Sequence, residues 1–408
     1  MKILISAYAC ETGRGGEGEI GWRVVREIAA NHDVWVITRA NLRDTHERTF
    51  RHEARPERLN FVYYDLPWIL RVCKGGKRFF LLYYYMWQLG AGLHARRLMA
   101  KQTFDVCHHL TGGMDWMPAG LSLCRAPLLW GPVGSENTHP VMLRKLPLAS
   151  RLKDRLRVAV RGVMRHADPF VRFSGQRARV VLSHTPETMP VRLSGKMKPY
   201  TQTGIENIPQ LVRPKTNLAR TGALRILYAG ELKDWKGALL ALKAALKYFE
   251  RDRHATLTIA GNGPLEPDMR ALVNRHPEGH RVVMAGHVPM DRLVTLMGQS
   301  DVFLYPSFHH GLATVVLQAM LTGLPVICLE GDATGRIVRQ QAGMTVALAM
   351  DRDPATDLAD AIDTLAGNED RRQSLARQGQ SMAREQYTYA SLASGIERAY
   401  REIGEGRP

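Results

Sequence analysis

Short hydrophobic runs alternate with amphipathic stretches along the first half of the chain. Each run has the length of one buried strand, and Ile20–Ala30 repeats its apolar positions with the period of a helix. The predicted strands are Lys2–Tyr8, Asp33–Thr38, Phe104–Leu110, Pro127–Trp130 and Arg179–His184. Apolar strands with helices between them are typical of a parallel sheet covered on both faces. Residues 1–205 are therefore predicted to form a doubly wound α/β domain.

The second half repeats this alternation more regularly, with helices predicted over Lys236–Phe249 and Thr314–Leu321. The predicted strands are Arg225–Gly230, Ala255–Gly261, Arg281–Gly286, Asp301–Tyr305 and Pro325–Leu329. We expect a second doubly wound domain over residues 206–385, joined to the first through the proline-containing segment Gly204–Asn217. Two such domains favour a ligand-binding cleft at the carboxyl ends of both sheets.

Length and composition fit two domains in a reducing compartment. A chain of 408 residues exceeds the roughly 250–300 residues that one core accommodates. Five scattered cysteines without C-x-x-C spacing exclude a disulfide framework and fit the cytoplasm. The longest apolar stretch, Phe79–Leu93, contains Gln88 and is shorter than the ~20 residues of a membrane-spanning helix. The N-terminal segment is interpreted as a buried strand and not as a signal peptide.

Charge is distributed unevenly between the two halves. The chain has 56 Lys and Arg against 39 Asp and Glu, a net charge of +17. Residues 1–205 hold 32 basic and 16 acidic residues, whereas residues 206–408 hold 24 and 23. This asymmetry indicates that the first half meets an anionic partner, for which a membrane surface, a nucleic acid and a phosphorylated substrate are the candidates.

Glycines after the first predicted strand form one candidate anion site. Gly13, Gly15 and Gly18 match the pattern G-x-G-x-x-G by letters. They begin several residues past the strand, however, and the second strand ends in Thr38-Arg39 where a dinucleotide site needs an acidic residue. Glycine backbone at a helix N-terminus can still bind an anion. The alternative interpretation is a flexible surface loop.

Two loops of the second half carry further candidates. Lys236 lies where the first predicted helix begins, so its charge adds to a helix dipole that favours anions. The stretch Tyr305–Ile327 predicts strand, loop, helix, glycine stop and strand, with Gln318 one helical turn after Thr314. The adjacent histidines His309 and His310 do not have the spacing of a metal pair. The alternatives are a solvated lysine and hydrogen-bonded loop histidines.

Together these stretches resemble the retaining glycosyltransferases of family 4, which have the GT-B fold. That family carries a Pro-Ser loop, a Glu-x7-Glu motif and a later Ala-Met…Gly-x-Pro-Val-Ile segment, and most of this pattern stands within Tyr305–Ile327. Four segments are similar to a bacterial subgroup of polysaccharide-assembly enzymes: Ser6–Trp22, Tyr83–Gln88, Asp105–Thr111 and Trp130–Gly134. The resemblance covers nearly the whole chain. It implies two Rossmann-like domains facing a cleft, and a C-terminal helix within residues 386–408 that returns to the N-terminal domain.

The resemblance implies a donor site for a nucleotide-diphosphate sugar in the second domain. Lys236 corresponds to a lysine that contacts the donor diphosphate and is a catalytic candidate. Gln318 corresponds to a glutamate that binds the ribose hydroxyls, and His310 to a glutamate that touches the donor sugar. His309 corresponds to a histidine of the bacterial subgroup. The remaining donor-binding candidates are Glu231, Gly311, Leu312, Ala313 and Thr314.

In the first domain the resemblance implies that Gly15 and Gly16 lie near the donor phosphates. His109 corresponds to a histidine that faces the donor sugar, which makes it the second catalytic candidate. The candidates on the acceptor side are Glu17, His108 and Trp116.

The chain departs from the family at three of these positions. Glu231 stands where the family has an arginine, and His310 and Gln318 replace the two motif glutamates. A carboxylate at Glu231 would repel a diphosphate unless it is turned away, and Lys233 is a candidate to supply the missing charge. These departures favour one alternative: a catalytically degenerate GT-B protein that binds a nucleotide or glycan without turnover.

Neither a cofactor nor a metal is expected. Lys236 and helix N-termini can stabilise the negative charge of the leaving diphosphate, and such preorganised donors are usually the largest catalytic contribution. Asp351-Arg-Asp353 matches an Asp-x-Asp metal motif by letters, but it precedes Pro354 and a predicted helix, so we interpret it as a helix start. A retaining reaction on one face of the sugar needs no enzyme nucleophile, and no catalytic base is assigned.

Basic and aromatic residues cluster in two segments of the first half. The stretch Arg71–Trp87 combines Lys and Arg with Phe, Tyr, Leu and Trp, which is typical of an interfacial segment. A second basic run extends from Arg144 to Arg179. Each cation near an anionic leaflet contributes about 1 kcal/mol of binding. We therefore expect a cytoplasmic protein, peripheral at the anionic inner membrane, with a saccharide or lipid-linked acceptor. The alternative is that the aromatic residues pack in the core and the arginines are solvated.

Two further function classes have weaker support from the sequence. Nucleic-acid binding would use the basic half, but no recognised module or RNA-binding pattern accompanies it, so no nucleic-acid partner is expected. A dinucleotide oxidoreductase is the least supported class, because the glycine pattern lacks its structural context.

Overall fold

The computed structural model describes residues 1–13, 16–71, 79–135, 143, 148–206, 223–308, 311–331, 333–339, 341–349 and 351–406. The chain divides into two compact units. Unit 1 comprises Met1–Glu136, Lys153–Gly204 and Tyr389–Pro408, and unit 2 comprises Asn137–Leu152 and Ile205–Thr388.

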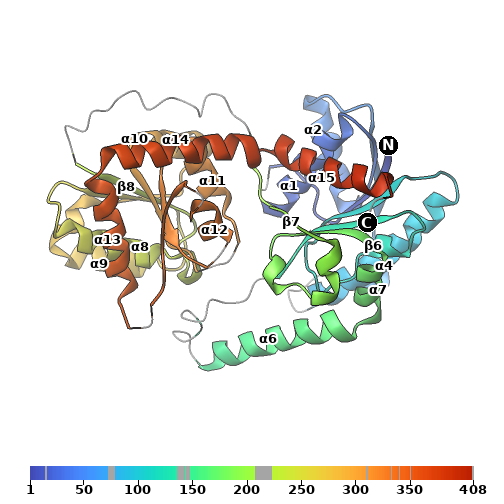
Figure 1. Cartoon of the computed structure of the whole chain (residues 1–408), viewed down its shortest axis with the longest axis horizontal. Helices are drawn as coiled ribbons and strands as arrows, with labels where there is room; N and C mark the ends of the chain where they lie inside the picture. Colours follow the sequence, from blue (N-terminus) through green and yellow to red (C-terminus); the bar gives the residue numbers. More distant parts are fainter. Residues whose placement is uncertain are drawn as a thin grey trace. The chain divides into compact units, whose positions relative to one another are not determined.

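Unit 1 is built on a seven-stranded, all-parallel sheet in the order β3-β2-β1-β4-β5-β6-β7 (Figure 1). Its strands are β1 (Lys2–Ala7), β2 (Asp33–Arg39), β3 (Leu59–Tyr64), β4 (Val106–Thr111), β5 (Leu128–Val133), β6 (Ala178–Ser183) and β7 (Met197–Pro199). Its helices are α1 (Gly16–Ala29), α2 (Arg43–His52), α3 (Trp68–Arg71), α4 (Phe80–Met99), α7 (Pro169–Arg177) and α15 (Tyr389–Gly404), and α6 (Leu148–Ala167) enters it from residue 153 on.

The two faces of this sheet carry separate hydrophobic cores. Successive side chains of a strand point to opposite faces, so Ile3 and Ile5 of β1 join one core while Leu4 joins the other. The first core also contains Trp22 of α1 and Ile396 of α15, and the second contains side chains of α4. Covered faces explain why the strands are continuous apolar runs.

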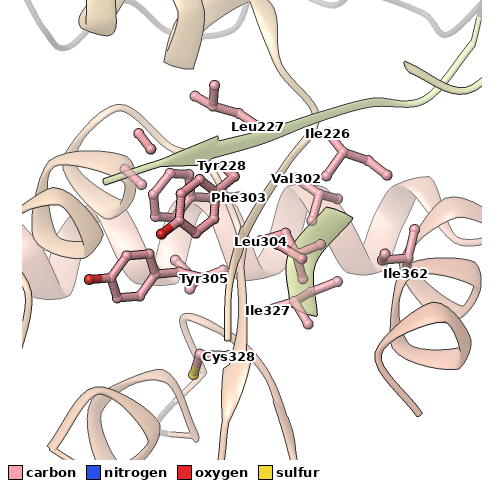
Figure 2. Close-up of a cluster of buried hydrophobic side chains, with 14 of the residues drawn as sticks. Ile226, Leu227, Tyr228, Val302, Phe303, Leu304, Tyr305, Ile327, Cys328 and Ile362 are labelled. Atoms are coloured by element: carbon pink, nitrogen blue, oxygen red, sulfur yellow. The ribbon is translucent and has the colours of Figure 1, made fainter. Parts of the chain in front are cut away.

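Unit 2 is built on a six-stranded parallel sheet in the order β10-β9-β8-β11-β12-β13 (Figure 1). Its strands are β8 (Arg225–Ala229), β9 (Thr256–Ala260), β10 (Val282–Gly286), β11 (Val302–Tyr305), β12 (Val326–Leu329) and β13 (Gly343–Val346). Its helices are α8 (Ala238–Phe249), α9 (Glu266–Arg275), α10 (Met290–Gln299), α11 (Thr314–Leu321), α12 (Ala333–Arg339), α13 (Pro354–Ala366) and α14 (Glu369–Gln386). Side chains of the central strands form its core, as Figure 2 shows for β8, β11 and β12.

The predicted fold, two doubly wound α/β domains, is confirmed. Each predicted strand is present, with ends shifted by at most a few residues. The predicted helix at Ile20–Ala30 begins earlier, at Gly16. Asp353 caps α13, because its side chain accepts a hydrogen bond from the Ala355 amide (3.2 Å). The interpretation of Asp351-Arg-Asp353 as a helix start is therefore correct.

The C-terminal helix returns to unit 1, as the resemblance implied. Leu392, Ile396 and Ile403 of α15 belong to the same core as Trp22 of α1. The Tyr400 hydroxyl donates a hydrogen bond to Nδ1 of His108 (2.6 Å), a residue of β4 that lies 292 positions earlier. The last helix thus completes the core of the first unit.

Replacing Tyr400 with phenylalanine should lower the free energy of unfolding of unit 1 by about 1–3 kcal/mol, because buried Nδ1 of His108 loses its hydrogen-bond donor. Urea unfolding followed by tryptophan fluorescence measures this loss. Arg401→Ala, at the exposed next position, is the matched control and should change stability little. Equal stability of Tyr400→Phe and the parent chain would contradict the assignment.

Candidate functional site

Both sheets reverse their strand order at one point. The reversal lies between β1 and β4 in unit 1 and between β8 and β11 in unit 2. In open α/β sheets, ligands bind outside the carboxyl ends of the strands at such a switch point. The residues singled out from the sequence lie in strand β4, in the loops that follow these four strands, or in the helices α1 and α11 that those loops enter.

In unit 2 the loops after β8 and β11 are tied together by hydrogen bonds. The Trp235 carbonyl accepts from the Phe308 amide (2.9 Å) and from the Ser307 hydroxyl (3.1 Å). Gly237 has φ +73, and a Cβ there would lie 2.0 Å from the Pro306 carbonyl oxygen. Only glycine fits this close approach. The two loops therefore form one rigid surface.

Lys236 lies in this surface as the last residue of the short 3-10 helix Asp234–Lys236, directly before α8. Its carbonyl accepts a hydrogen bond from the Tyr228 hydroxyl (3.1 Å). Burial raises the pKa of Tyr228, so the hydroxyl keeps its proton and stays a donor. The Tyr228 and Tyr305 rings stack at 6.0 Å, and their hydroxyl groups point toward the carboxyl end of β8 (Figure 2).

Glu231 is neutralised by a neighbour. Its Oε1 lies 2.5 Å from Nζ of Lys233, and the same ammonium lies 5.2 Å from the centre of the Trp235 ring. The pair is partly exposed, so it contributes little stability. Its effect is local: it compensates the negative charge at a position where an anion would otherwise be repelled.

The start of α11 supplies the other predicted donor residues. Gly311 accepts a hydrogen bond from the Thr334 hydroxyl (3.3 Å), and Leu312 and Ala313 pack against the core of unit 2. Thr314 is the first residue of α11 and is exposed, and Nε2 of Gln318 lies 3.5 Å from Sδ of Met290. His309 and His310 lie outside the described residues.

In unit 1, the Glu17 carboxylate binds the backbone amides that directly follow β4. Its Oε1 accepts from the backbone N–H groups of Gly112 (2.7 Å) and Gly113 (3.1 Å) and from Nε2 of Gln202 (3.2 Å). Gly16 opens α1 with φ +64, whereas Gly15 lies outside the described residues. Glu17 therefore holds the loop after β4 against the first turn of α1.

Arg39 occupies the position where a dinucleotide site needs an acid. Its guanidinium donates to the Tyr8 carbonyl (2.8 Å) and pairs with Oε1 of Glu11 (3.3 Å) at the end of β2. The carboxyl end of β2 thus carries Arg39 and not the acidic residue that binds a ribose in dinucleotide sites, which agrees with the weak sequence support for an oxidoreductase.

His108 and His109 are adjacent in β4 and fully buried on opposite faces of the sheet. His108 uses both ring nitrogens, since Nε2 donates to the Gly131 carbonyl (2.7 Å) and Nδ1 accepts from Tyr400. Burial lowers the pKa of His108 to about 3. These contacts give His108 a structural role, and its predicted place on the acceptor side stays a prediction.

His109 has a different environment. Its Nε2 lies 3.5 Å from the Gly112 carbonyl oxygen, and its buried Nδ1 has no hydrogen-bond partner within the described part of the chain. Burial lowers the pKa of His109 to about 4, so the imidazole is neutral near pH 7. A buried polar atom without a partner is uncommon, which keeps His109 a candidate for a ligand contact.

Trp116, the last acceptor-side candidate, is buried in the loop that follows β4. The Arg161 guanidinium of α6 lies 6.0 Å from the centre of its ring. Nε of Arg165 pairs with Asp115 at 2.5 Å, and the Ser135 hydroxyl donates to the same carboxylate. Helix α6 is therefore attached to the loop that follows β4, the strand that carries His109.

Residues 223–368 match the family model described as Glycosyl transferases group 1. This match lies within unit 2, which is therefore similar to the corresponding region of group 1 glycosyltransferases. Two curated relatives are alpha-D-kanosaminyltransferase of Streptomyces kanamyceticus, 22% identical over 44% of this chain, and the putative colanic acid biosynthesis glycosyltransferase WcaL of Escherichia coli K12, 26% identical over 33%. The chain spans only 46% and 37% of these two relatives.

A solved structure of the same architecture is that of Anabaena Alr3699/HepE in complex with UDP. It matches with a TM-score of 0.62 at 14% identity, over 98% of this chain and all of that one. The GT-B fold predicted from the sequence is thereby confirmed.

Sequence reasoning missed several residues that shape the candidate site. Tyr228 and Gln202 contact Lys236 and Glu17, respectively, and Tyr400 contacts His108. The contacts of Gln202 and Tyr400 connect segments far apart in the chain, so no local pattern indicates them. Tyr228 is the exception, because it lies near the carboxyl end of a predicted strand and one loop before Lys236.

Proposed function

We propose that this chain transfers a sugar, with retention of its anomeric configuration, from a nucleotide-diphosphate donor to a saccharide acceptor in bacterial surface or exopolysaccharide assembly. The observation that carries the proposal is the interlocked pair of loops after β8 and β11, which brings Lys236 and the start of α11 to one edge of unit 2. The UDP complex of HepE and the polysaccharide role in the name of WcaL support the donor class and the process.

The charges of these loops suit a diphosphate leaving group. Breaking the sugar–phosphate bond leaves negative charge on the departing diphosphate, and fixed positive groups stabilise that charge. Lys236 supplies one ammonium at the edge of unit 2. Lys233 compensates Glu231, so the carboxylate that replaces the family's arginine does not oppose the diphosphate. No step of this scheme requires an enzyme nucleophile.

His109 is proposed to contact the donor sugar. Its neutral imidazole keeps an unpartnered Nδ1, which accepts a hydrogen bond from a sugar hydroxyl without an added positive charge. Gln318 is proposed to bind the ribose hydroxyls through its amide. The glutamate-to-glutamine change replaces a charge-assisted hydrogen bond with a neutral one, which weakens the contact without removing it.

We further propose that the acceptor is lipid-linked and that the protein works at the cytoplasmic face of the inner membrane as a peripheral protein. The excess basic charge of residues 1–205 supports this location. Large apolar side chains of α3 and of the segment that begins α4 are exposed: Trp68, Ile69, Leu70, Phe79, Phe80, Leu81 and Leu82. Among the described helices, none combines the length and hydropathy needed to cross a bilayer.

Screening UDP, GDP, ADP and TDP sugars tests the proposal. Sugars of one nucleotide class are expected to raise the Tm of the protein, and the increase should grow with the ligand concentration. A ligand that binds only the folded state stabilises that state. The same donor should transfer or slowly hydrolyse its sugar, with the anomeric configuration of the product followed by NMR. Binding without any turnover would favour the degenerate alternative that the replaced residues Glu231, His310 and Gln318 suggest. No binding by any of the donors would reject both.

A further inference from the structure

Helix α6 exposes a continuous apolar face. Its side chains Leu148, Leu152, Leu156, Val160 and Val163 are 80%, 66%, 63%, 46% and 62% exposed. Their spacing of three or four residues places them on one side of the helix, because each residue advances about 100° around the axis. Soluble helices normally bury such a face against the protein.

The opposite side of α6 holds the helix to unit 1. Arg161 and Arg165 project roughly opposite to Leu156 and Val163, and they contact Trp116 and Asp115 in the loop after β4. Because these contacts fix the rear of the helix from residue 153 on, the side chains of Leu156, Val160 and Val163 point away from unit 1.

The flanks of this face are cationic. Lys153, Arg155 and Arg157 border the apolar residues, whereas Asp154 is the single acidic residue of the helix and pairs with Arg157. An apolar face bordered by Lys and Arg has the chemistry of a helix that lies in the plane of an anionic lipid surface. A soluble protein partner would not require this excess of cations.

We propose that α6 is an interfacial anchor: its apolar face enters the acyl boundary of an anionic leaflet while its basic flanks contact the lipid phosphates. This inference deepens the membrane part of the proposed function by naming the docking element and its lipid partner. It does not depend on the transfer reaction, so its test uses no sugar donor.

Co-sedimentation of the full chain with phosphatidylcholine vesicles, with and without phosphatidylglycerol, tests the anchor. We expect binding only to the anionic vesicles, and weaker binding at high salt. The double variant Leu156→Ser/Val163→Ser should bind the anionic vesicles about 10-fold or more weakly. It lacks two apolar side chains whose transfer from water into the membrane would favour binding. Both positions are exposed, so Tm should be unchanged. Val191→Ser is the matched control, since Val191 is 87% exposed but lies outside α6.

The outcomes separate the competing explanations. If the parent chain binds anionic vesicles and the α6 double variant binds equally, the anchor assignment is overturned while a membrane location stands. If the parent chain binds no vesicle, both are overturned, and the transfer activity is judged separately by the nucleotide-sugar screen. If light scattering shows a dimer that the double variant dissociates, without vesicle binding, the apolar face joins two copies of the chain and the lipid proposal is overturned.

Discussion

Replacing Lys236 with alanine is expected to lower kcat/KM for sugar transfer by about 10²–10³-fold, the usual effect of removing one preorganised group that stabilises transition-state charge. The lysine lies in a surface held by the Tyr228 hydroxyl and by the hydrogen bonds of Trp235. The backbone of Lys236 is therefore fixed before a donor arrives. Initial rates over a range of donor concentrations measure the loss and divide it between kcat and KM.

The matched control for this change is Lys243→Ala, which removes an exposed lysine from the middle of α8. It should leave kcat/KM within about twofold, because a solvated surface charge contributes little. Similar losses in the two variants would show a general electrostatic effect and would contradict a specific role for Lys236. Unchanged activity of Lys236→Ala would remove the diphosphate site from this loop.

Acidification should destabilise unit 1 through two of its buried histidines, His108 and His109. The pKa values of His108 and His109 fall from 6.5 to about 3 and about 4, because burial disfavours the charged imidazolium. Below pH 6.5 these two histidines bind protons in the unfolded chain but stay neutral in the folded chain. The free energy of unfolding therefore falls as the pH falls toward 4. Each histidine contributes a slope of roughly 1.4 kcal/mol per pH unit in this window.

Urea unfolding at a series of pH values between 7 and 4.5 measures this dependence. Six of the seven tryptophans lie in unit 1, so their fluorescence reports on the unit that holds both histidines. His109→Asn should remove one histidine's share of the slope, whereas the exposed His287→Asn serves as the control and should keep the parent slope. A slope that is the same in parent and His109→Asn would contradict the burial argument.

Five of the six described strands of unit 2 could be predicted, and β8, β11 and β12 among them are short, apolar and almost fully buried. The edge strand β13 (Gly343–Val346) was not identified, because only Val346 in it is buried. Strand β3 (Leu59–Tyr64) was not identified from the sequence, since it lies at the sheet edge and only Leu59 is fully buried. A half-buried edge strand has a weaker pattern than a central one. The helix α6 was noticed only as a run of arginines, because its apolar face is not used inside the unit.

The candidate site was predictable where topology alone brings residues together. Lys236 and Ser307 follow adjacent parallel strands, and their loops meet because carboxyl ends of parallel strands share one edge. The contacts of Glu17 with Gly112 and of His108 with Tyr400 depend on the fold of a whole unit. No spacing rule encodes such contacts, so they required the structure.

The return of α15 to unit 1 has a consequence for how the protein is made. Leu392, Ile396 and Tyr400 fill a core whose first strand, β1, leaves the ribosome hundreds of residues earlier. Unit 2 is synthesised in between and can complete its own core before that helix exists. The order of maturation therefore differs from the order of translation. The core around β1 keeps part of its apolar surface uncovered until α15 docks, although β1 is translated before unit 2.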